Sequence, residues 1–265
     1  METPVRAIAL LATVCLALAA CGGEGSTIEP PDPPVGEPLL PDIVPAPPTD
    51  VRMARQNGRW LISFSSILVN IGEGDFILRA TRNAGVWRVE QDIPYSTSGA
   101  RSVAVPAQLT WGGDGHGHWH IDRVAVNRLV PLDDSGRPEP GEGLADSKVG
   151  FCFYDFSLQL DHGPPEAVYS REACGNSMDE DAIGMGLSRG WGDTYNFGLP
   201  GQSIDVTELP DGMYRLWAEA DAKSWFRESR SDNNTTWVDI ELSTSPRGLR
   251  TTRIAQIGPL IRPDS

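Results

Sequence analysis

Short segments in which apolar and polar residues alternate constrain the fold of this chain more than any other feature. In residues 213–220, Tyr214, Leu216, Ala218 and Ala220 share one face, as in a half-buried strand. Clusters of Gly, Pro, Asn and Asp separate such segments, and no long amphipathic helical stretch interrupts them. The pattern predicts a mainly β fold, a β-sandwich with long loops. The expected strands are Arg59–Phe64, Arg101–Val105, Val149–Tyr154, Met213–Ala220 and Thr236–Leu242.

The last of these segments carries charge on its polar face. Val238, Ile240 and Leu242 alternate with Asp239 and Glu241. We expect the three apolar side chains to face the core and both carboxylates to point outward.

The N-terminal residues predict export. Arg6 precedes an apolar run, 7–20, that is too short to span a bilayer but suits the core of a signal peptide. The run ends in Leu18-Ala19-Ala20-Cys21, which resembles the bacterial lipobox, whose cysteine is lipidated. We therefore expect an exported lipoprotein, anchored through Cys21 at the outer membrane or cell surface. The alternative is an ordinary signal peptide cleaved near Ala20.

The remainder divides into a tether, one large domain and a tail. Residues 21–39 are rich in proline and predict an extended, semi-rigid tether. The domain is expected to cover residues 40–242. Residues 243–265 have no clear assignment, and we expect a solvated, partly ordered C-terminal extension. Its arginines are Arg247, Arg250, Arg253 and Arg262.

Charge and cysteine content restrict the partners and the compartment. A net charge of −14 argues against nucleic acids and anionic membranes as ligands, and favours cations such as protonated amines. Cys152 and Cys174 are the only cysteines of the expected domain. In an oxidising compartment such a pair predicts a disulfide, which contributes about 3–4 kcal/mol in the chain-entropy model. Two buried free thiols are the alternative.

Three of the chain's four histidines stand at alternate positions in the stretch 116–120, which reads His-Gly-His-Trp-His. A strand would place these imidazoles on one face, but a flat strand would separate His116 from His120 by roughly 13 Å. A metal–nitrogen bond is only about 2 Å long, so the strand must bend for all three to bind one ion. Gly115 and Gly117 are expected to permit that bend.

This histidine set predicts a metal site without fixing the metal. Three imidazoles without cysteine or carboxylate suit copper or zinc, and their spacing does not separate the two. A zinc hydrolase stays open, although no His-Glu-x-x-His base accompanies the histidines. Adventitious metal binding by an exposed strand is the other alternative.

Four segments, in the same order, resemble the lysyl oxidase family. Trp111 to His120 is similar to that family's copper-binding segment, and Lys148-Val149-Gly150-Phe151-Cys152 resembles the segment that supplies its cofactor lysine. Asp193-Thr194-Tyr195, with the stretch 204–214, resembles the cofactor-tyrosine region. Glu228-Ser229 with Asn233-Asn234 resembles a stretch near the domain's end.

The resemblance implies copper held by His116, His118 and His120, and a lysine tyrosylquinone cofactor made from the protein itself. Tyr195 would become the quinone and Lys148 its cross-linked partner. With molecular oxygen, such an enzyme oxidises primary amines, as peptidyl lysine or small amines, to aldehydes and releases ammonia and hydrogen peroxide. Asp193 neighbours Tyr195 and is a candidate for the base, with orienting that tyrosine or capping a turn as the alternative role.

The family also has a calcium site that joins the beginning of the domain to its end. The resemblance implies a structural calcium ion here, although Arg230 stands where an acidic ligand would be expected. The matching positions are Asp42, the Ile43 carbonyl, Glu228, Asn233 and Asn234.

A function of another class stays open. Leu209 to Leu242 also resembles small β-sandwich adhesion modules, which share a Gly-x-Tyr strand followed by an acidic turn with two asparagines. The protein would then be a surface binding module with a structural metal and no turnover. Lys148 and Tyr195 discriminate between the two, because an adhesion module has no need of that pair.

Overall fold

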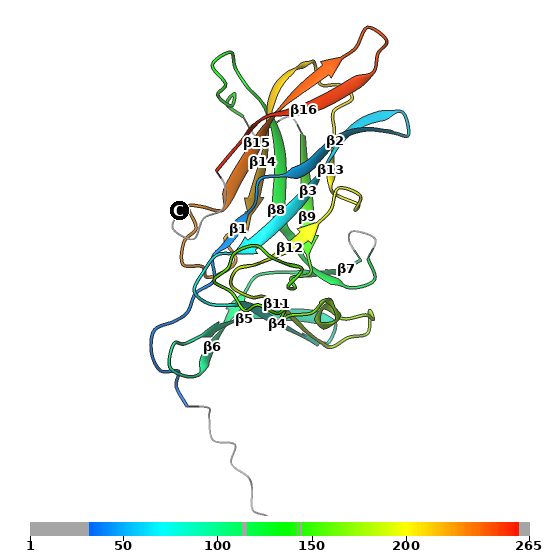
Figure 1. Cartoon of the computed structure of the whole chain (residues 1–265). Helices are drawn as coiled ribbons and strands as arrows, with labels where there is room; N and C mark the ends of the chain where they lie inside the picture. The colour runs from blue at the N-terminus through cyan, green and yellow to red at the C-terminus, as the bar shows by residue number, and fades with distance from the viewer. Residues whose placement is uncertain (1–31, 113–115, 142, 144, 260–265) are drawn as a thin grey trace, which may run out of the picture. The chain divides into compact units, whose positions relative to one another are not determined.

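The computed structural model describes residues 32–112, 116–141, 143 and 145–259, although the side chains of Ala145, Asp146 and Lys148 lie outside this description. Strands dominate these residues, and the one helical element among them is a short 3-10 turn, η1 (Arg171–Cys174), so the predicted mainly β fold is confirmed (Figure 1). No helix in the described part of the chain has the length and apolar character needed to cross a membrane. The strands are β1 (Ile43–Pro45), β2 (Thr49–Gln56), β3 (Arg59–Asn70), β4 (Phe76–Asn83), β5 (Val86–Pro94), β6 (Ala100–Val105), β7 (Leu109–Trp111), β8 (Trp119–Pro131), β9 (Ala145–Phe151), β10 (Ser157–Leu158), β11 (Ala182–Leu187), β12 (Trp191–Tyr195), β13 (Ser203–Asp205), β14 (Gly212–Ala220), β15 (Thr235–Thr244) and β16 (Arg250–Ile257).

These strands form antiparallel sheets. The first has the order β1-β3-β12-β10, and its long strand β3 also pairs with β2 and β13. The second has the order β11-β4-β5-β6. The third has the order β16-β15-β14-β8-β7, with β9 paired to β8, and Figure 1 shows β8, β14 and β15 running alongside one another. Two strands, β3 and β8, therefore organise most of the pairing around the histidine segment.

Alternation along β14 and β15 builds part of the core, as the sequence predicts. Tyr214, Leu216, Ala218 and Ala220 are buried, and so are Val238, Ile240 and Leu242. Each fully buried side chain of Leu or Ile size contributes roughly 1.5–3 kcal/mol through removal from water. A further cluster of buried side chains, which includes Trp119, Phe151 and Tyr195, surrounds the histidine segment.

Asp239 points away from the core face of β15, as predicted, but it is not exposed to solvent. Its exposed fraction is only 4%, and it accepts hydrogen bonds from Arg215 at 2.7 and 2.9 Å. The two residues are register partners on β14 and β15, so their side chains share the face opposite the core. The bidentate ion pair makes burial of the carboxylate tolerable, and the Arg215 guanidinium also lies 3.5 Å from the centroid of the Trp237 ring.

The predicted C-terminal extension contains an ordered strand. Residues 250–257 form β16, which pairs with β15. Arg250 is buried and donates to the carbonyl oxygens of Val206, Thr207 and Leu209, so it ties this strand to the loop after β13. Arg247 and Arg253 are exposed, as expected, and Arg262 lies outside the described residues.

The predicted signal peptide, residues 1–20, and Cys21 lie outside the described residues, as does most of the predicted tether. The last tether residues lie along the hairpin of β5 and β6. Val35 and Pro38 form isolated bridges with Ser98 and Tyr95, and the Leu39 N–H donates to the Pro94 carbonyl oxygen at 2.8 Å.

Candidate metal centre

The histidine segment connects β7 to β8. The two strands pair Trp111 with Trp119, and the Gly112 N–H donates to the His118 carbonyl oxygen at 3.0 Å. Gly112 has a φ of +59°, and a Cβ at this position would lie 2.8 Å from the His116 carbonyl oxygen. Only glycine fits such a conformation without strain, so Gly112 is the residue that permits the tight turn.

The backbone bends at Gly117 and His118, as the histidine spacing predicts. β8 begins at Trp119, so His120 lies on the strand while His116 and His118 precede it. Gly117 shows no positive φ, and nothing lies within 4 Å of its Cβ position. The sterically demanding position is therefore Gly112 rather than Gly117, while Gly115 lies outside the described residues.

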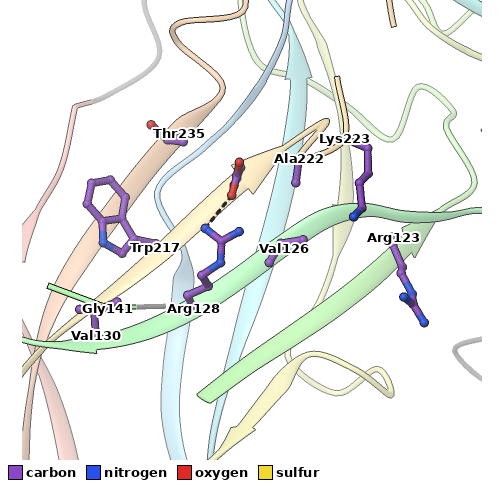
Figure 2. A pocket seen from close by; sticks show the side chains of 10 residues that line it. Arg123, Val126, Arg128, Val130, Gly141, Trp217, Ala222, Lys223 and Thr235 are labelled. Carbon is purple, nitrogen blue, oxygen red and sulfur yellow. Dashed lines mark ion pairs between the residues drawn. The ribbon is translucent and has the colours of Figure 1, made fainter. Parts of the chain in front are cut away.

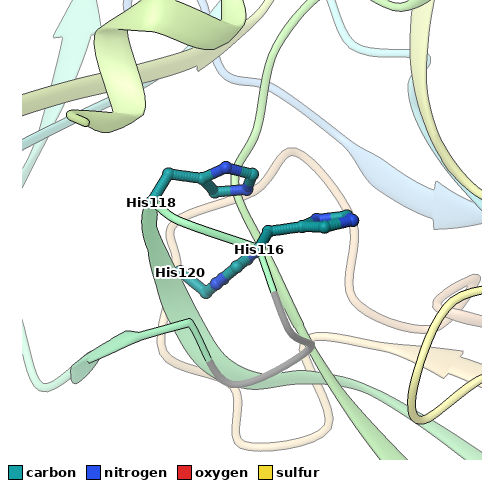
Figure 3. A group of neighbouring side chains, drawn as sticks. All are labelled: His116, His118 and His120. Carbon is teal, nitrogen blue, oxygen red and sulfur yellow. The ribbon is translucent and has the colours of Figure 1, made fainter.

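The turn gathers the three imidazoles in one place (Figure 3). One ring nitrogen from each of His116, His118 and His120 lies within 4.8 Å of the others. Nitrogen ligands of a single ion, each about 2.1 Å from it, lie at most about 4.2 Å apart, so small side-chain rotations suffice for binding. His118 and His120 are 6% and 1% exposed, so neither serves as an ordinary surface histidine. Three neutral imidazole donors fit copper or zinc.

Tyr195 lies beside this cluster. Its ring centroid is 6.4 Å from that of His116 and 6.2 Å from that of His120, and its side chain is 3% exposed. The ring packs on Phe151 at 4.2 Å, and the Cys152 N–H donates to the Tyr195 hydroxyl oxygen at 3.0 Å. The structure therefore brings the predicted cofactor tyrosine to the predicted metal ligands.

Lys148 is placed by its backbone alone. It lies on β9 opposite Val126 of β8, and its side chain lies outside the description. It stands four positions before Cys152, so the two Cα atoms are at most about 14 Å apart. Gly150 lies between them, and a Cβ there would stand 2.9 Å from the Ile121 carbonyl oxygen and 3.2 Å from the His120 Cβ. Glycine at this position lets β9 approach the strand that carries His120.

The predicted disulfide between Cys152 and Cys174 is confirmed. Both cysteines are fully buried, and Cys174 is the last residue of η1. Because the Cys152 N–H also contacts Tyr195, the disulfide joins η1 to the segment that holds the tyrosine hydroxyl.

A small cavity of about 170 Å³ opens at this centre. Asp193, the candidate base, does not line it but is fully buried on β12, two residues before Tyr195. Burial raises the pKa of Tyr154, the Asp193 carboxylate raises it further, and Arg171 acts in the opposite direction. The lining residues are His116, His118, Tyr154, Phe156, Arg171, Thr194, Tyr195, Asn196 and Leu199.

The predicted calcium ligands also converge, in a cluster that we call the acidic junction: Asp42, Glu228, Asn233 and Asn234. The Asn233 amide donates to both oxygens of Asp42, at 3.1 and 3.2 Å, and the Asn234 amide donates to Glu228 at 2.9 Å. The Ile43 N–H donates to Glu228 at 2.7 Å. Arg230 is exposed and pairs with Asp232 at 3.0 Å.

Electrostatics at the acidic junction favour a cation. Burial raises the pKa of Glu228 to about 8, and the nearby carboxylates of Asp221 and Asp42 also raise it. The side-chain oxygens of Asn233 and Asn234 are buried and accept no hydrogen bond within the described part of the chain. Rotating each amide by 180° would point these oxygens at the carboxylates, which is favourable only with a cation between them.

A separate groove of about 770 Å³ lies over β8 and β14, away from the histidines (Figure 2). Arg128 pairs there with Glu219 at 2.8 Å, next to the indole of Trp217. Val126, the register partner of Lys148, also lines this groove. None of the predicted metal ligands is among its described lining residues.

Several contacts at the centre lie beyond what the sequence predicts. Phe151 and Cys152 belong to the predicted lysine segment, but nothing in the sequence shows that they contact Tyr195. Arg171 and Phe156 reach the cavity from segments with no motif of their own. Gly150 carried a signal, as a glycine within an expected strand, but its reason is visible only in the approach of β8 and β9.

Comparisons with known proteins give one family. A sequence model of the lysyl oxidase family matches residues 137–250. The chain is 34% identical over 126 residues to protein-lysine 6-oxidase of Gallus gallus, which covers 47% of this chain and 26% of that relative. This chain thus spans about a quarter of the length of that relative.

Proposed function

We propose that the protein oxidises primary amines to aldehydes with copper and a self-derived quinone, as a member of the lysyl oxidase family, whose sequence model matches residues 137–250. The observation that carries the proposal is the position of Tyr195, whose ring lies 6.2–6.4 Å from those of His120 and His116. A phenol beside a copper ion is the arrangement needed for oxidation of its ring. The predicted cross-link partner, Lys148, lies on the strand that leads to Cys152.

The residues present fit such a cofactor. His116, His118 and His120 would hold copper, and Tyr195 and Lys148 would form lysine tyrosylquinone. This quinone supplies an electron acceptor for the amine, and molecular oxygen takes up the electrons, giving hydrogen peroxide, ammonia and an aldehyde.

The surrounding side chains orient Tyr195 and exclude water. Phe151 packs against the ring, and the Cys152 N–H holds the oxygen that is now the tyrosine hydroxyl. Asp193 and Tyr195 share one face of β12, because they stand two residues apart. Because Asp193 does not line the cavity, we propose that its carboxylate orients Tyr195 rather than accepting the α-proton of the substrate amine.

Peptide mass mapping of copper-loaded protein tests the proposal directly. We expect one cross-linked peptide pair that contains both Lys148 and Tyr195, and hydrogen peroxide release on addition of a primary amine. Tyr195→Phe is the matched control, because it keeps the ring and its packing but removes the oxygen. Unmodified Lys148 and Tyr195 peptides in every molecule would refute the quinone and favour a surface binding module without turnover. A firm preference for zinc, measured after refolding with both ions, would favour a hydrolase.

The substrate class is proposed at the level of primary amines. The Gallus gallus relative is named for oxidation of protein lysine, but the chain matches only a quarter of that protein. Small amines and peptidyl lysine are therefore both to be assayed.

Two further features complete the proposal. We propose a structural calcium ion at the acidic junction, supported by the raised pKa of Glu228 and the buried amide oxygens of Asn233 and Asn234. We also propose export as a lipoprotein anchored through Cys21. Loss of a radiolabelled fatty acid from a Cys21→Ser variant, with the signal peptide left intact, would support the anchor.

A further inference from the structure

The mouth of the cavity beside Tyr195 is aromatic and basic. Phe156 is 54% exposed, and its ring meets that of Tyr154 edge to face at 6.0 Å between centroids. Leu199, in the segment after β12, adds an apolar side chain. None of the described residues that line this cavity is an aspartate or glutamate.

An exposed phenylalanine at the edge of a small cavity can contact what enters it. Phe156 is more than half exposed, whereas Phe151 and Phe153, a few residues earlier, are fully buried. An apolar group that covers Phe156 gains the free energy of removing both surfaces from water. The ring therefore favours a ligand with an apolar part outside the cavity.

Arg171 is held at the same mouth by covalent structure. It is the first residue of η1, whose last residue, Cys174, is bonded to Cys152. Cys152 in turn donates its N–H to the Tyr195 hydroxyl. The backbone that carries Arg171 is thus linked covalently to the segment that contacts Tyr195, while the Arg171 side chain is exposed.

Charges of opposite sign act on the cavity. Beyond the effect of burial, the buried Asp193 raises the pKa of the lining residue Tyr154, and the exposed Arg171, which itself lines the cavity, lowers it. Glu172, which follows Arg171, is exposed, does not line the cavity and raises the pKa of Tyr154 less than Arg171 lowers it. A primary ammonium group is attracted inward, whereas a second positive charge on the same ligand would stop beside Arg171.

We propose that Phe156 and Arg171 form a selective rim that favours primary amines with an apolar, uncharged far end over amines with a second positive charge. The inference rests on the proposed amine oxidation and narrows its substrate class. It also reverses what the net charge of −14 suggests about cationic ligands. Surface charges beyond a Debye length of about 8–10 Å are screened, so the rim charge outweighs the distant acidic residues.

Hexylamine and 1,6-diaminohexane test the rim, because they differ only in the terminal ammonium group. Binding is measured by calorimetry on copper-loaded protein, and turnover by peroxide release. We expect hexylamine to bind about fivefold more tightly than 1,6-diaminohexane. Repulsion between Arg171 and the second ammonium group accounts for this, because one exposed charge pair is worth about 1 kcal/mol. The same ratio should appear in KM rather than kcat, and it should shrink in high salt.

Variants assign the selection to the two residues. Arg171→Gln should reduce the ratio of the two dissociation constants, that of 1,6-diaminohexane over that of hexylamine, to below about twofold. Arg171→Lys should keep most of the preference. Arg189→Gln is the matched control, since it removes an equally exposed arginine that does not line the cavity. Phe156→Ser should weaken hexylamine about threefold and leave 1,6-diaminohexane nearly unchanged, because only the former covers the ring.

The readouts separate this inference from the proposed function. Preferential binding of hexylamine that depends on Arg171, without oxidation of either amine, would support the rim and refute the amine oxidase. Equal dissociation constants, or no binding of either amine, would overturn the rim whether or not turnover occurs. A preference that persists in Arg171→Gln would overturn it as well.

Discussion

The histidine centre and the acidic junction are both buried polar clusters, but they are assembled in different ways. His116, His118 and His120 come from one segment of five residues, whereas the acidic junction joins Asp42 to residues 228–234. The histidines lie within a core of aromatic rings. In the acidic junction, burial raises the pKa of Glu228 to about 8, and repulsion from Asp221 and Asp42 adds to this effect.

This difference separates what each cluster needs in order to be stable. A neutral imidazole costs little to bury, so the centre can be formed before the metal arrives. A buried carboxylate must be paired, protonated or bound to a cation. The acidic junction should therefore depend on pH and calcium, and the histidine centre on its turn and its packing.

The largest expected effect is on copper binding at the histidine centre. His120→Ala removes the most deeply buried of the three imidazoles, and we expect copper affinity to fall more than about 100-fold, since loss of a mere outer-shell partner costs 10–100-fold. His162→Ala, which changes the fourth histidine of the chain, should retain copper. Metal analysis after dialysis against a competing chelator measures both. If His120→Ala also changed the stabilisation of the protein by calcium, the histidine centre and the acidic junction would not be independent.

The next effect is on stability as a function of pH. The folded pKa of Glu228, about 8, exceeds its unfolded value of 4.5, so the native state prefers the protonated acid. The stability that this preference contributes is present below about pH 4.5 and is lost as the pH rises to 8. At about 1.4 kcal/mol per unit, the loss is about 4–5 kcal/mol without a bound cation.

Chemical denaturation between pH 5 and pH 8 measures this loss. Calcium should restore stability at pH 8, because it replaces the proton. Glu228→Gln should flatten the pH dependence and abolish the calcium effect, while His162→Ala should leave both unchanged. A wild-type slope that matches that of Glu228→Gln would contradict the raised pKa.

Particular residues show how far the sequence predicts this molecule. The alternation along 213–220 and 236–242 correctly predicts strands and their buried faces, because period-two burial is a local property. The face of Asp239 is predicted correctly, but its burial is not, because that burial depends on Arg215, a partner on the neighbouring strand. β16 was missed because residues 250–257 pair along one edge with β15 and leave most of their side chains exposed, so they show little apolar pattern.

The same division holds at the candidate site. The spacing of the histidines predicts a bend in the backbone, since three alternate imidazoles can bind one metal ion only if the backbone bends. The position of Gly112 as the residue at positive φ was not predictable, because several glycines stand in that stretch. The contact between the Cys152 N–H and Tyr195 joins positions 43 residues apart, and no local pattern reports such a pair.

Loss of the disulfide is expected to affect the histidine centre but not the acidic junction. Replacing Cys152 and Cys174 together by alanine should lower the free energy of unfolding by about 3 kcal/mol, given their sequence separation of 22. It should also loosen η1 and the segment that contacts Tyr195, so the yield of cross-linked peptide should fall. Calcium should stabilise the variant as much as the wild type. Denaturation curves with and without calcium test the first claim, and mass mapping tests the second.

The smallest effect distinguishes two glycines near the histidines. Gly150→Ala places a methyl group 2.9 Å from the Ile121 carbonyl oxygen and 3.2 Å from the His120 Cβ. β9 must then move away from β8, at a cost of about 1–3 kcal/mol. Gly117→Ala is the matched control, because nothing lies within 4 Å of its Cβ position and its φ is not positive. We expect Gly117→Ala to keep the wild-type midpoint of chemical denaturation and the wild-type copper affinity, and Gly150→Ala to lower both. Equal behaviour of the two variants would mean that the approach of β9 to His120 does not position this ligand.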